Sequence, residues 1–99
     1  MRPVILIWQP QAEESFRNQV EWLEANRDRK AVTHFLQEVA QALTQLRDGL
    51  VSYRVIDVQR NIRSCPANKY MVLHHRPVAE GMELLTFFDT RQNPDKLKL

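Results

Sequence analysis

The sequence has little glycine, little cysteine and no long hydrophobic run, and each shortage excludes a class of protein. Its 99 residues contain only two glycines and one cysteine. Two distant glycines cannot form the glycine-rich loop that cradles phosphate groups. A single cysteine, Cys65, excludes an internal disulfide and a paired-cysteine metal motif, and it fits a reducing compartment. Neither an apolar run of about 18 residues nor a signal-peptide pattern is found, so we expect a cytoplasmic protein without a membrane segment.

The charged residues are nearly balanced overall but unevenly distributed along the chain. The formal net charge is +2. Residues 1–48 contain six Lys or Arg against seven Asp or Glu, whereas residues 49–99 contain eight against five. A basic surface in the second half suits a phosphate backbone or an acidic protein partner. The length fits one domain, residues 1–99, with a single two-layer core.

Two stretches have the three- and four-residue apolar spacing of amphipathic helices. The first begins near Pro10, a residue type favoured in the first turn of a helix, and runs to about Ala25. The second covers residues 28–48, between a capping residue, Asp28, and a terminating glycine, Gly49. The short link between them predicts an antiparallel hairpin. We expect these apolar side chains to pack on a sheet: Phe16, Val20, Leu23, Phe35, Leu36, Val39 and Leu43.

The other apolar segments are short or alternate with polar residues, as strands do. One strand is predicted at Val4–Trp8, before the helices. Pro77 is expected to end the penultimate strand, and Cys65–Asn68 is expected to be a turn. This order predicts an α+β fold, in which an N-terminal strand and a helical hairpin precede a four-stranded antiparallel meander with the helices on one face. The four late strands are predicted at Ser52–Asp57, Gln59–Cys65, Tyr70–His75 and Met82–Asp89.

No catalytic motif is present, but basic side chains recur along the late strands. His74 and His75 are adjacent, so they point to opposite faces of a strand and cannot share a metal ion. His34 is expected at the surface, and Cys65 is expected to be buried and unreactive. We expect no metal and no cofactor. The following groups could converge on one sheet face, to stabilise an anionic transition state or to dock a partner: Arg54, Arg60, Arg63, Lys69, one of the two histidines and Arg91.

Over nearly its whole length the chain resembles the RelE/ParE superfamily, the toxins of bacterial type II toxin–antitoxin modules, which are often called plasmid stabilisation proteins. The similarity includes Trp8 and Pro10 at the start of the first helix, Trp22-Leu23 near its end, and Phe35–Val39 in the second helix. It ends in the segment 84–94, LLTFFDTRQNP, whose Arg-Gln-Asn-Pro ending is the most specific part. Between these it continues through Tyr53-Arg54, Ile62-Arg63 and Lys69–His74.

The resemblance implies partners and candidate site residues. Members of the ParE branch poison DNA gyrase, whereas members of the RelE branch cut mRNA on the ribosome. Met71 stands where the RelE branch has an arginine, and no tyrosine follows Tyr70, which favours the ParE branch. The implied partners are a cognate antitoxin, with no binding residues assigned, and gyrase. Arg63 and Arg91 match recurring ParE-branch positions, and the expected target-binding set is Arg54, Arg60, Arg63, His74 and Arg91.

Three hypotheses for the function remain open at this point. In the first, the chain is a ParE-like toxin that binds gyrase and performs no chemistry. In the second, it is a RelE-like, metal-independent endoribonuclease that acts on RNA at the ribosome, with Arg63, His74 and Arg91 as the catalytic candidates. In the third, it is a non-toxic binding module with the same fold. Separate readouts of mRNA cleavage and DNA supercoiling would distinguish the first two.

Overall fold

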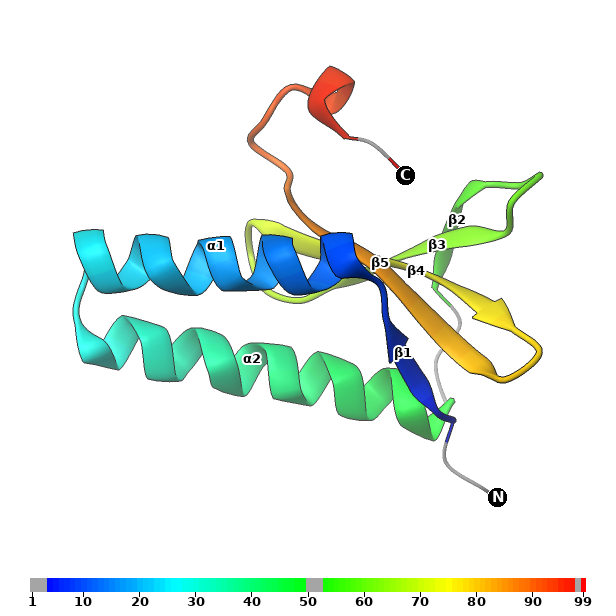
Figure 1. The fold of residues 1–99 in the computed structure, drawn as a ribbon, viewed down its shortest axis with the longest axis horizontal. Coiled ribbons are helices and arrows are strands. Elements are labelled where there is room, and N and C mark those ends of the chain that lie inside the picture. Colours follow the sequence, from blue (N-terminus) through cyan, green and yellow to red (C-terminus); the bar gives the residue numbers. More distant parts are fainter. Residues whose placement is uncertain (1–3, 50–52, 98) are drawn as a thin grey trace.

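The two predicted helices are present, with ends close to those predicted. The computed structural model describes residues 4–49, 53–97 and 99. Helix α1 (Pro10–Asn26) has a proline at its first position, where a missing N–H costs little. Helix α2 (Arg29–Asp48) is capped by Asp28, which accepts a hydrogen bond from the Ala31 amide at 2.9 Å. It ends at Gly49, whose φ is 67°, and the two helices form the predicted antiparallel hairpin (Figure 1).

The strands form one five-stranded mixed sheet in the order β1-β5-β4-β3-β2. The last four strands pair antiparallel with their neighbours in the sequence, as predicted: β2 (Arg54–Asp57), β3 (Ile62–Pro66), β4 (Met71–Val78) and β5 (Gly81–Asp89). Strand β1 (Leu6–Trp8) adds in parallel to the other edge of β5. The α+β class is therefore confirmed, and the predicted meander is part of a wider sheet. Strand β5 therefore has a partner strand on each of its two edges.

The boundaries of β3 differ from the prediction at both ends. Residues 58–61 form a turn, because Asn61 has a positive φ of 54°, which a strand does not allow. The predicted start of this strand at Gln59 is therefore wrong. At the other end, Pro66 still pairs with Val72 of β4, so the turn that was expected at Cys65–Asn68 begins only after Pro66. Ser52, the predicted first residue of β2, lies outside the described residues.

Pro77 does not end β4, contrary to the prediction. It pairs with Met82 of β5, and the strand continues to Val78. Strand β3 pairs with β4 only as far as His75. From Arg76 onward, one edge of β4 consequently has no partner strand in the described part of the chain. Pro77 has no backbone N–H to donate, and proline is tolerated at an edge that lacks a partner strand.

The helices cover one face of the sheet, and an aromatic cluster joins the two layers. Phe16 of α1 stacks on Phe35 of α2 with ring centroids 5.8 Å apart, and it contacts Trp8 and Phe87 at 5.7 Å each. Leu36 is 43% exposed, so the prediction that it packs on the sheet is wrong. The other residues of the two predicted stripes are buried in the core or packed against it: Val20, Leu23, Val39 and Leu43.

Helix α1 also completes the edge of β5 that β1 leaves open. Strand β1 pairs only with Met82, Glu83 and Leu84. Further along β5, the Phe87 amide donates a hydrogen bond to the Ser15 hydroxyl of α1 at 2.9 Å. A buried backbone N–H without a partner is costly, so this hydroxyl fixes the position of α1 on the sheet.

The segment after β5 leaves the end of that strand on the side away from α2 (Figure 1). It contains a short 3₁₀ helix, η1 (Pro94–Lys96). The Arg60 guanidinium donates to the carbonyl oxygen of Leu99 at 3.0 Å, and Leu99 borders a hollow together with Leu85. Ile62, which is 1% exposed, is buried outside the core that the helices cover. Among the described residues, neither helix combines the length and the apolar character that crossing a bilayer requires.

Candidate functional site

The basic side chains of the late strands do not gather on one face, contrary to the prediction. Arg63 of β3 pairs with His75, and alternation along the strand places it on the same side as Cys65, towards the helices. Arg54 of β2 pairs with Ser64 and therefore points to the opposite face. Arg91 lies beyond the end of β5, beside Tyr70. Because His75 lies five residue steps after Tyr70 in extended chain, Arg91 and Arg63 lie beside positions about 16 Å apart.

Arg91 has several contacts at the exit of β5. Its Nε and Nη2 atoms donate to the two carboxylate oxygens of Asp89 at 3.0 Å and 2.6 Å. Its guanidinium also lies over the Tyr70 ring, 4.2 Å from the centroid. The hydrogen bonds from Arg91 lower the pKa of Asp89, which stays ionised at neutral pH. Arg91 keeps free donors towards solvent.

The two other candidate cations outside the strands have local partners. Arg60, in the turn between β2 and β3, forms an ion pair with Asp57 at 2.7 Å. Lys69 lies 5.5 Å from the centroid of the Tyr70 ring, on the turn that precedes β4. His34, as expected, is at the surface, where Nε2 lies 3.6 Å from a Glu38 oxygen. Such exposed pairs contribute little to stability, so these cations remain usable for binding.

A buried polar cluster lies on the helix side of β3 and β4. The Tyr53 and His75 rings meet edge to face at 5.5 Å, and His75 is fully buried. Burial and the neighbouring Cys65 raise the pKa of Tyr53 to about 12. Burial also raises the pKa of the Cys65 thiol, which is 0% exposed. The expectation of a buried, unreactive thiol therefore fits the structure, since a reactive cysteine needs access and a lowered pKa.

His74 is buried, so it is not available as a surface acid or base. It is 4% exposed, on the sheet face away from the helices, with its ring 6.2 Å from that of Phe88. In the described structure neither of its ring nitrogens has a hydrogen-bond partner. Desolvation, with a smaller effect of His75, lowers the pKa of His74 to about 4. At neutral pH both histidines are uncharged, which removes them from a solvent-facing catalytic role.

The burial of His74 predicts a pH dependence of stability. Its folded-state pKa of about 4 lies below the ordinary value of 6.5, so the unfolded chain binds more protons between these values. Stability should therefore fall as the pH drops from about 6.5 to about 4, by up to ~3 kcal/mol. Urea unfolding across this range measures the effect. His74→Phe should flatten the curve, and an unchanged slope in this variant would show that His74 is not its source.

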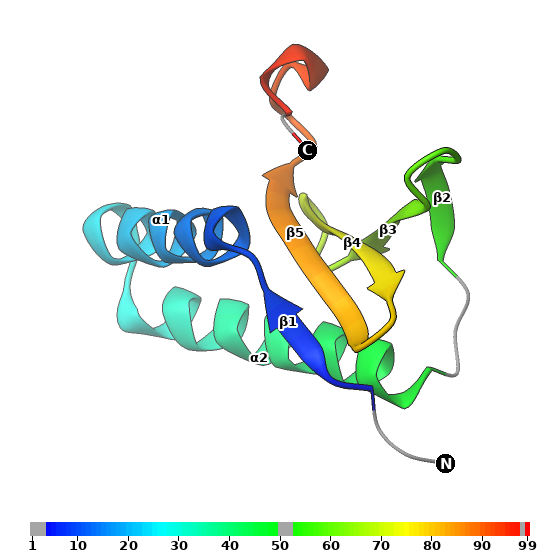
Figure 2. The same ribbon diagram turned by 45° about the vertical axis from the view of Figure 1, so that its right-hand side comes forward.

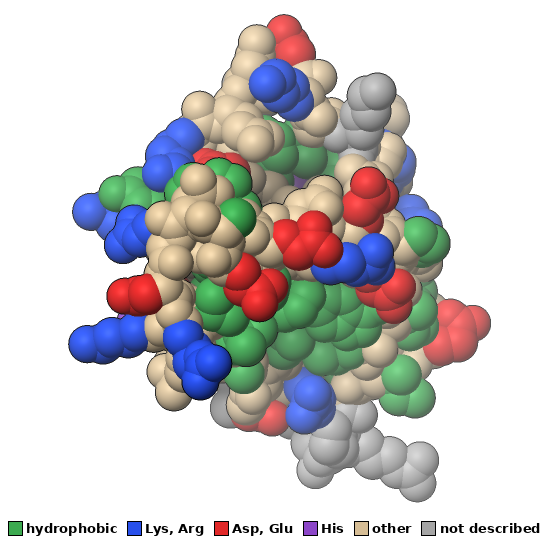
Figure 3. All heavy atoms as spheres, turned by 60° about the vertical axis from the view of Figure 1, so that its left-hand side comes forward, with side chains coloured by type: hydrophobic (Ala, Val, Ile, Leu, Met, Phe, Trp, Pro, Cys, Tyr) green, Lys and Arg blue, Asp and Glu red, His purple; other side chains and the backbone are tan. Residues whose placement is uncertain are grey.

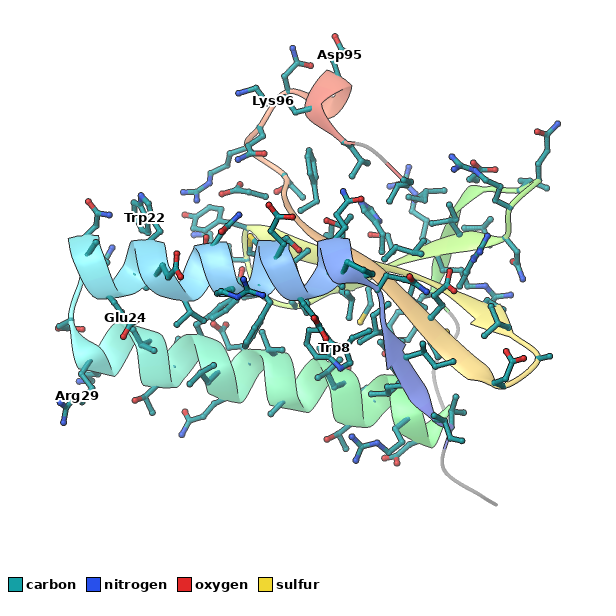
Figure 4. All side chains as sticks on the ribbon, in the orientation of Figure 1. Trp8, Trp22, Glu24, Arg29, Asp95 and Lys96 are labelled. Carbon is teal, nitrogen blue, oxygen red and sulfur yellow. The ribbon has the colours of Figure 1, made fainter. Side chains whose placement is uncertain are left out.

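A groove lies between the joined end of the helical hairpin and the turn before β4. Its volume is about 860 Å³. Trp22 and Tyr70, which are 52% and 42% exposed, border it, and Figure 4 shows Trp22 projecting from α1 on the side away from α2. We call this the hairpin-end groove. It carries two acidic side chains, Asp28 and Glu38, and four basic ones, Arg27, Arg29, Lys30 and Arg91, around the apolar residues Leu23 and Phe35.

Sequence reasoning identified Arg91 but missed the groove around it. The wall residues come from α1, from α2 and from positions 68–91, so no local pattern connects them. Trp22 was the available signal, because a tryptophan beside an amphipathic stripe is costly to leave exposed. An exposed aromatic pair within a basic rim suits a protein partner with apolar and acidic side chains.

A second apolar surface lies on the helical side of the molecule. Figure 3 shows hydrophobic side chains gathered there, with Asp, Glu, Lys and Arg side chains around them. A hollow of about 350 Å³ on this side is lined by Trp8, Phe16 and Val20, with Glu13 and Arg17 at its border. Figure 4 places Trp8 between the two helices. We call this the helix-face patch, and apolar surface of this kind is typical of interaction sites.

In residues 4–49, 53–97 and 99, no group of three or more His, Cys, Asp or Glu side chains is placed so that it could hold a metal ion.

A scan against models of known protein families found no match, and neither did a search of curated proteins. Assignment of a function therefore depends on the geometry and on the resemblance of the sequence motifs.

Proposed function

We propose that the chain is the toxin of a type II toxin–antitoxin module, of the ParE-like kind, and that it acts by binding DNA gyrase in the cytoplasm. The observation that carries the proposal is the order of elements: a strand, a helical hairpin and four antiparallel strands that end in Arg91-Gln92-Asn93-Pro94. This is the fold that the resemblance implies. Fold alone does not define function, so the site has to discriminate among the hypotheses.

The side chains favour binding over chemistry. General acid–base catalysis needs a titratable group near neutral pH within reach of substrate, yet His74 and His75 are buried and uncharged. Stabilising an anionic transition state needs several donors aimed at one point, yet Arg63 lies beside His75 within β4, whereas Arg91 lies beside Tyr70, which precedes that strand. An exposed arginine at the rim of a groove bordered by Trp22 and Tyr70 is instead the kind of residue that dominates protein interfaces.

The helix-face patch is the proposed docking surface for the antitoxin. Its apolar residues lie beside the hairpin and β1, where an apolar segment of a partner could complete the core. The product of an adjacent antitoxin-like reading frame should therefore bind the purified chain. We expect Val20→Lys to weaken this binding at least about tenfold, because it puts a charge into an apolar contact. Ala40→Lys, on the exposed side of α2, is the control and should not change it.

Growth inhibition tests the proposal and the two arginines together. Induced expression of the wild type should stop growth and reduce DNA supercoiling while leaving mRNA intact. Arg91→Ala and Arg63→Ala should fold, bind antitoxin and lose most of the inhibition, because Arg side chains at interfaces often contribute ~2 kcal/mol or more. Arg47→Ala, an exposed position in the last turn of α2, is the control and should remain toxic.

Two outcomes would replace the proposal. Cleavage of ribosome-bound mRNA by the wild type, abolished by a change at His74 while binding persists, would establish the RelE-like endoribonuclease. Binding of an antitoxin without growth inhibition would indicate a non-toxic binding module. If both arginine variants stay fully toxic, the exit of β5 has only a structural role.

A further inference from the structure

Strand β2 forms an outer edge of the sheet and is unusually exposed for a strand so rich in β-branched residues. It is the last strand in the sheet order, and no strand pairs with its outer edge in the described residues (Figure 2). Val55 and Ile56 are 43% and 37% exposed, and Val58, just beyond the strand, is 85% exposed. Edge strands with apolar side chains tend to pair with a strand of another molecule, so proteins either block such an edge or use it as a binding surface.

The sequence of this edge is complementary to itself. We propose that β2 pairs antiparallel with β2 of a second copy of the chain, about a two-fold axis between Val55 and Ile56. In that register Arg54 lies opposite Asp57 of the other copy, and Val55 lies opposite Ile56. Opposite charges and β-branched pairs are among the cross-strand combinations that stabilise sheets.

The charges at this edge are in the state that such pairing requires. Hydrogen bonds from Arg60 lower the pKa of Asp57, so its carboxylate is ionised at neutral pH. Asp57 is fixed at the strand end, because it accepts hydrogen bonds from the Arg60 amide at 3.1 Å and from its Nε at 2.7 Å. Arg54 is exposed and forms no ion pair in the described structure. Its guanidinium is thus available to a carboxylate on a facing strand.

The geometry also predicts a weak, closed dimer. Strand β2 has four residues, and its pairing with β3 shifts register between Val55 and Asp57, which increases twist and shortens the straight edge. The contact area is accordingly small, as in transient complexes. A two-fold contact uses the same edge on both copies, so it ends at a dimer and does not continue into a filament. This inference is independent of the proposed toxin function.

Sedimentation equilibrium of the full chain over a wide concentration range tests the pairing. Variants that reverse the charge at Arg54 or at Asp57 show whether this edge forms the contact. Arg54→Glu places two carboxylates opposite each other at both ends of the paired segment. This substitution should raise the dissociation constant of the dimer at least about tenfold. Asp57→Lys should do the same by opposing two cations. An equal mixture of these two variants forms a heterodimer in which both pairs are again opposite in sign, and it should dimerise about as well as the wild type.

Folding of each variant is checked by thermal unfolding, since Asp57→Lys also loses the Arg60 contact. Arg54→Glu removes no ion pair of the described structure and keeps the test valid if Asp57→Lys does not fold. A wild type that remains monomeric at the highest soluble concentration would overturn the proposal. A dimer that is insensitive to Arg54→Glu would overturn it as well, because the contact would then lie elsewhere.

Discussion

Phe35→Ala is expected to lower the free energy of unfolding by about 3–5 kcal/mol. Phe35 is 3% exposed in α2, and its ring stacks on that of Phe16 at 5.8 Å. Through Phe16 it is connected to Trp8 of β1 and Phe87 of β5. Truncation therefore removes transfer free energy and leaves a cavity where two helices meet the sheet. The aromatic contact itself adds roughly 0.5–1.5 kcal/mol to this loss.

Leu36→Ala is the matched control for Phe35→Ala. It lies one residue further along α2 but is 43% exposed, so the same measurement by urea unfolding should give a change below about 1 kcal/mol. The contrast tests which face of α2 is inside. If Leu36→Ala were the more damaging of the two, α2 would have to be rotated relative to the sheet.

Gly81→Ala is the second change with a large expected effect, about 3 kcal/mol or more. Gly81 has a φ of 157°, which side chains rarely adopt, and an added Cβ would overlap the carbonyl oxygen of Ile5. That oxygen accepts a hydrogen bond from the Met82 amide at 2.8 Å, at the start of the parallel pairing of β1 with β5. The extra methyl group would push β1 away from the sheet. Thermal or urea unfolding measures the loss.

Gly49→Ala separates backbone strain from crowding. Gly49 has a φ of 67° at the end of α2, but nothing lies within 4 Å of a Cβ built there. The substitution should therefore cost only the conformational penalty, about 1 kcal/mol. Equal losses in the two glycine variants would contradict the close approach of Ile5 to the β4–β5 turn.

The helices could be predicted from the sequence because their signals are local. Asp28 and Gly49 mark the limits of α2 within a few residues of its apolar stripe. Strand ends depend on neighbours that are distant in sequence, so they were harder to predict. Pro77 stays within β4 only because β3 ends its pairing at His75. Asn61 shortens β3 through its own positive φ, which residue type alone suggests only weakly.

The candidate site was less predictable than the fold. Adjacent histidines on a strand were expected to have one ring towards a basic surface. Both are buried: His75 lies on the face of β4 that the helices cover, and His74 lies on the other face beside Phe88. The hairpin-end groove joins Trp22 to Tyr70 and Arg91, which lie far from it in the sequence. Only the folded chain brings these side chains together.

Purified chain and purified gyrase provide the most direct test of the central claim, that this protein inhibits a protein target by binding and without chemistry. Gyrase supercoiling of relaxed plasmid should fall as the wild-type chain is added and should be restored by the antitoxin. Arg91→Ala should inhibit poorly at the same concentration, and ribosome-bound mRNA incubated with the wild type should stay intact. Full gyrase activity at saturating chain, together with cut mRNA, would contradict the account.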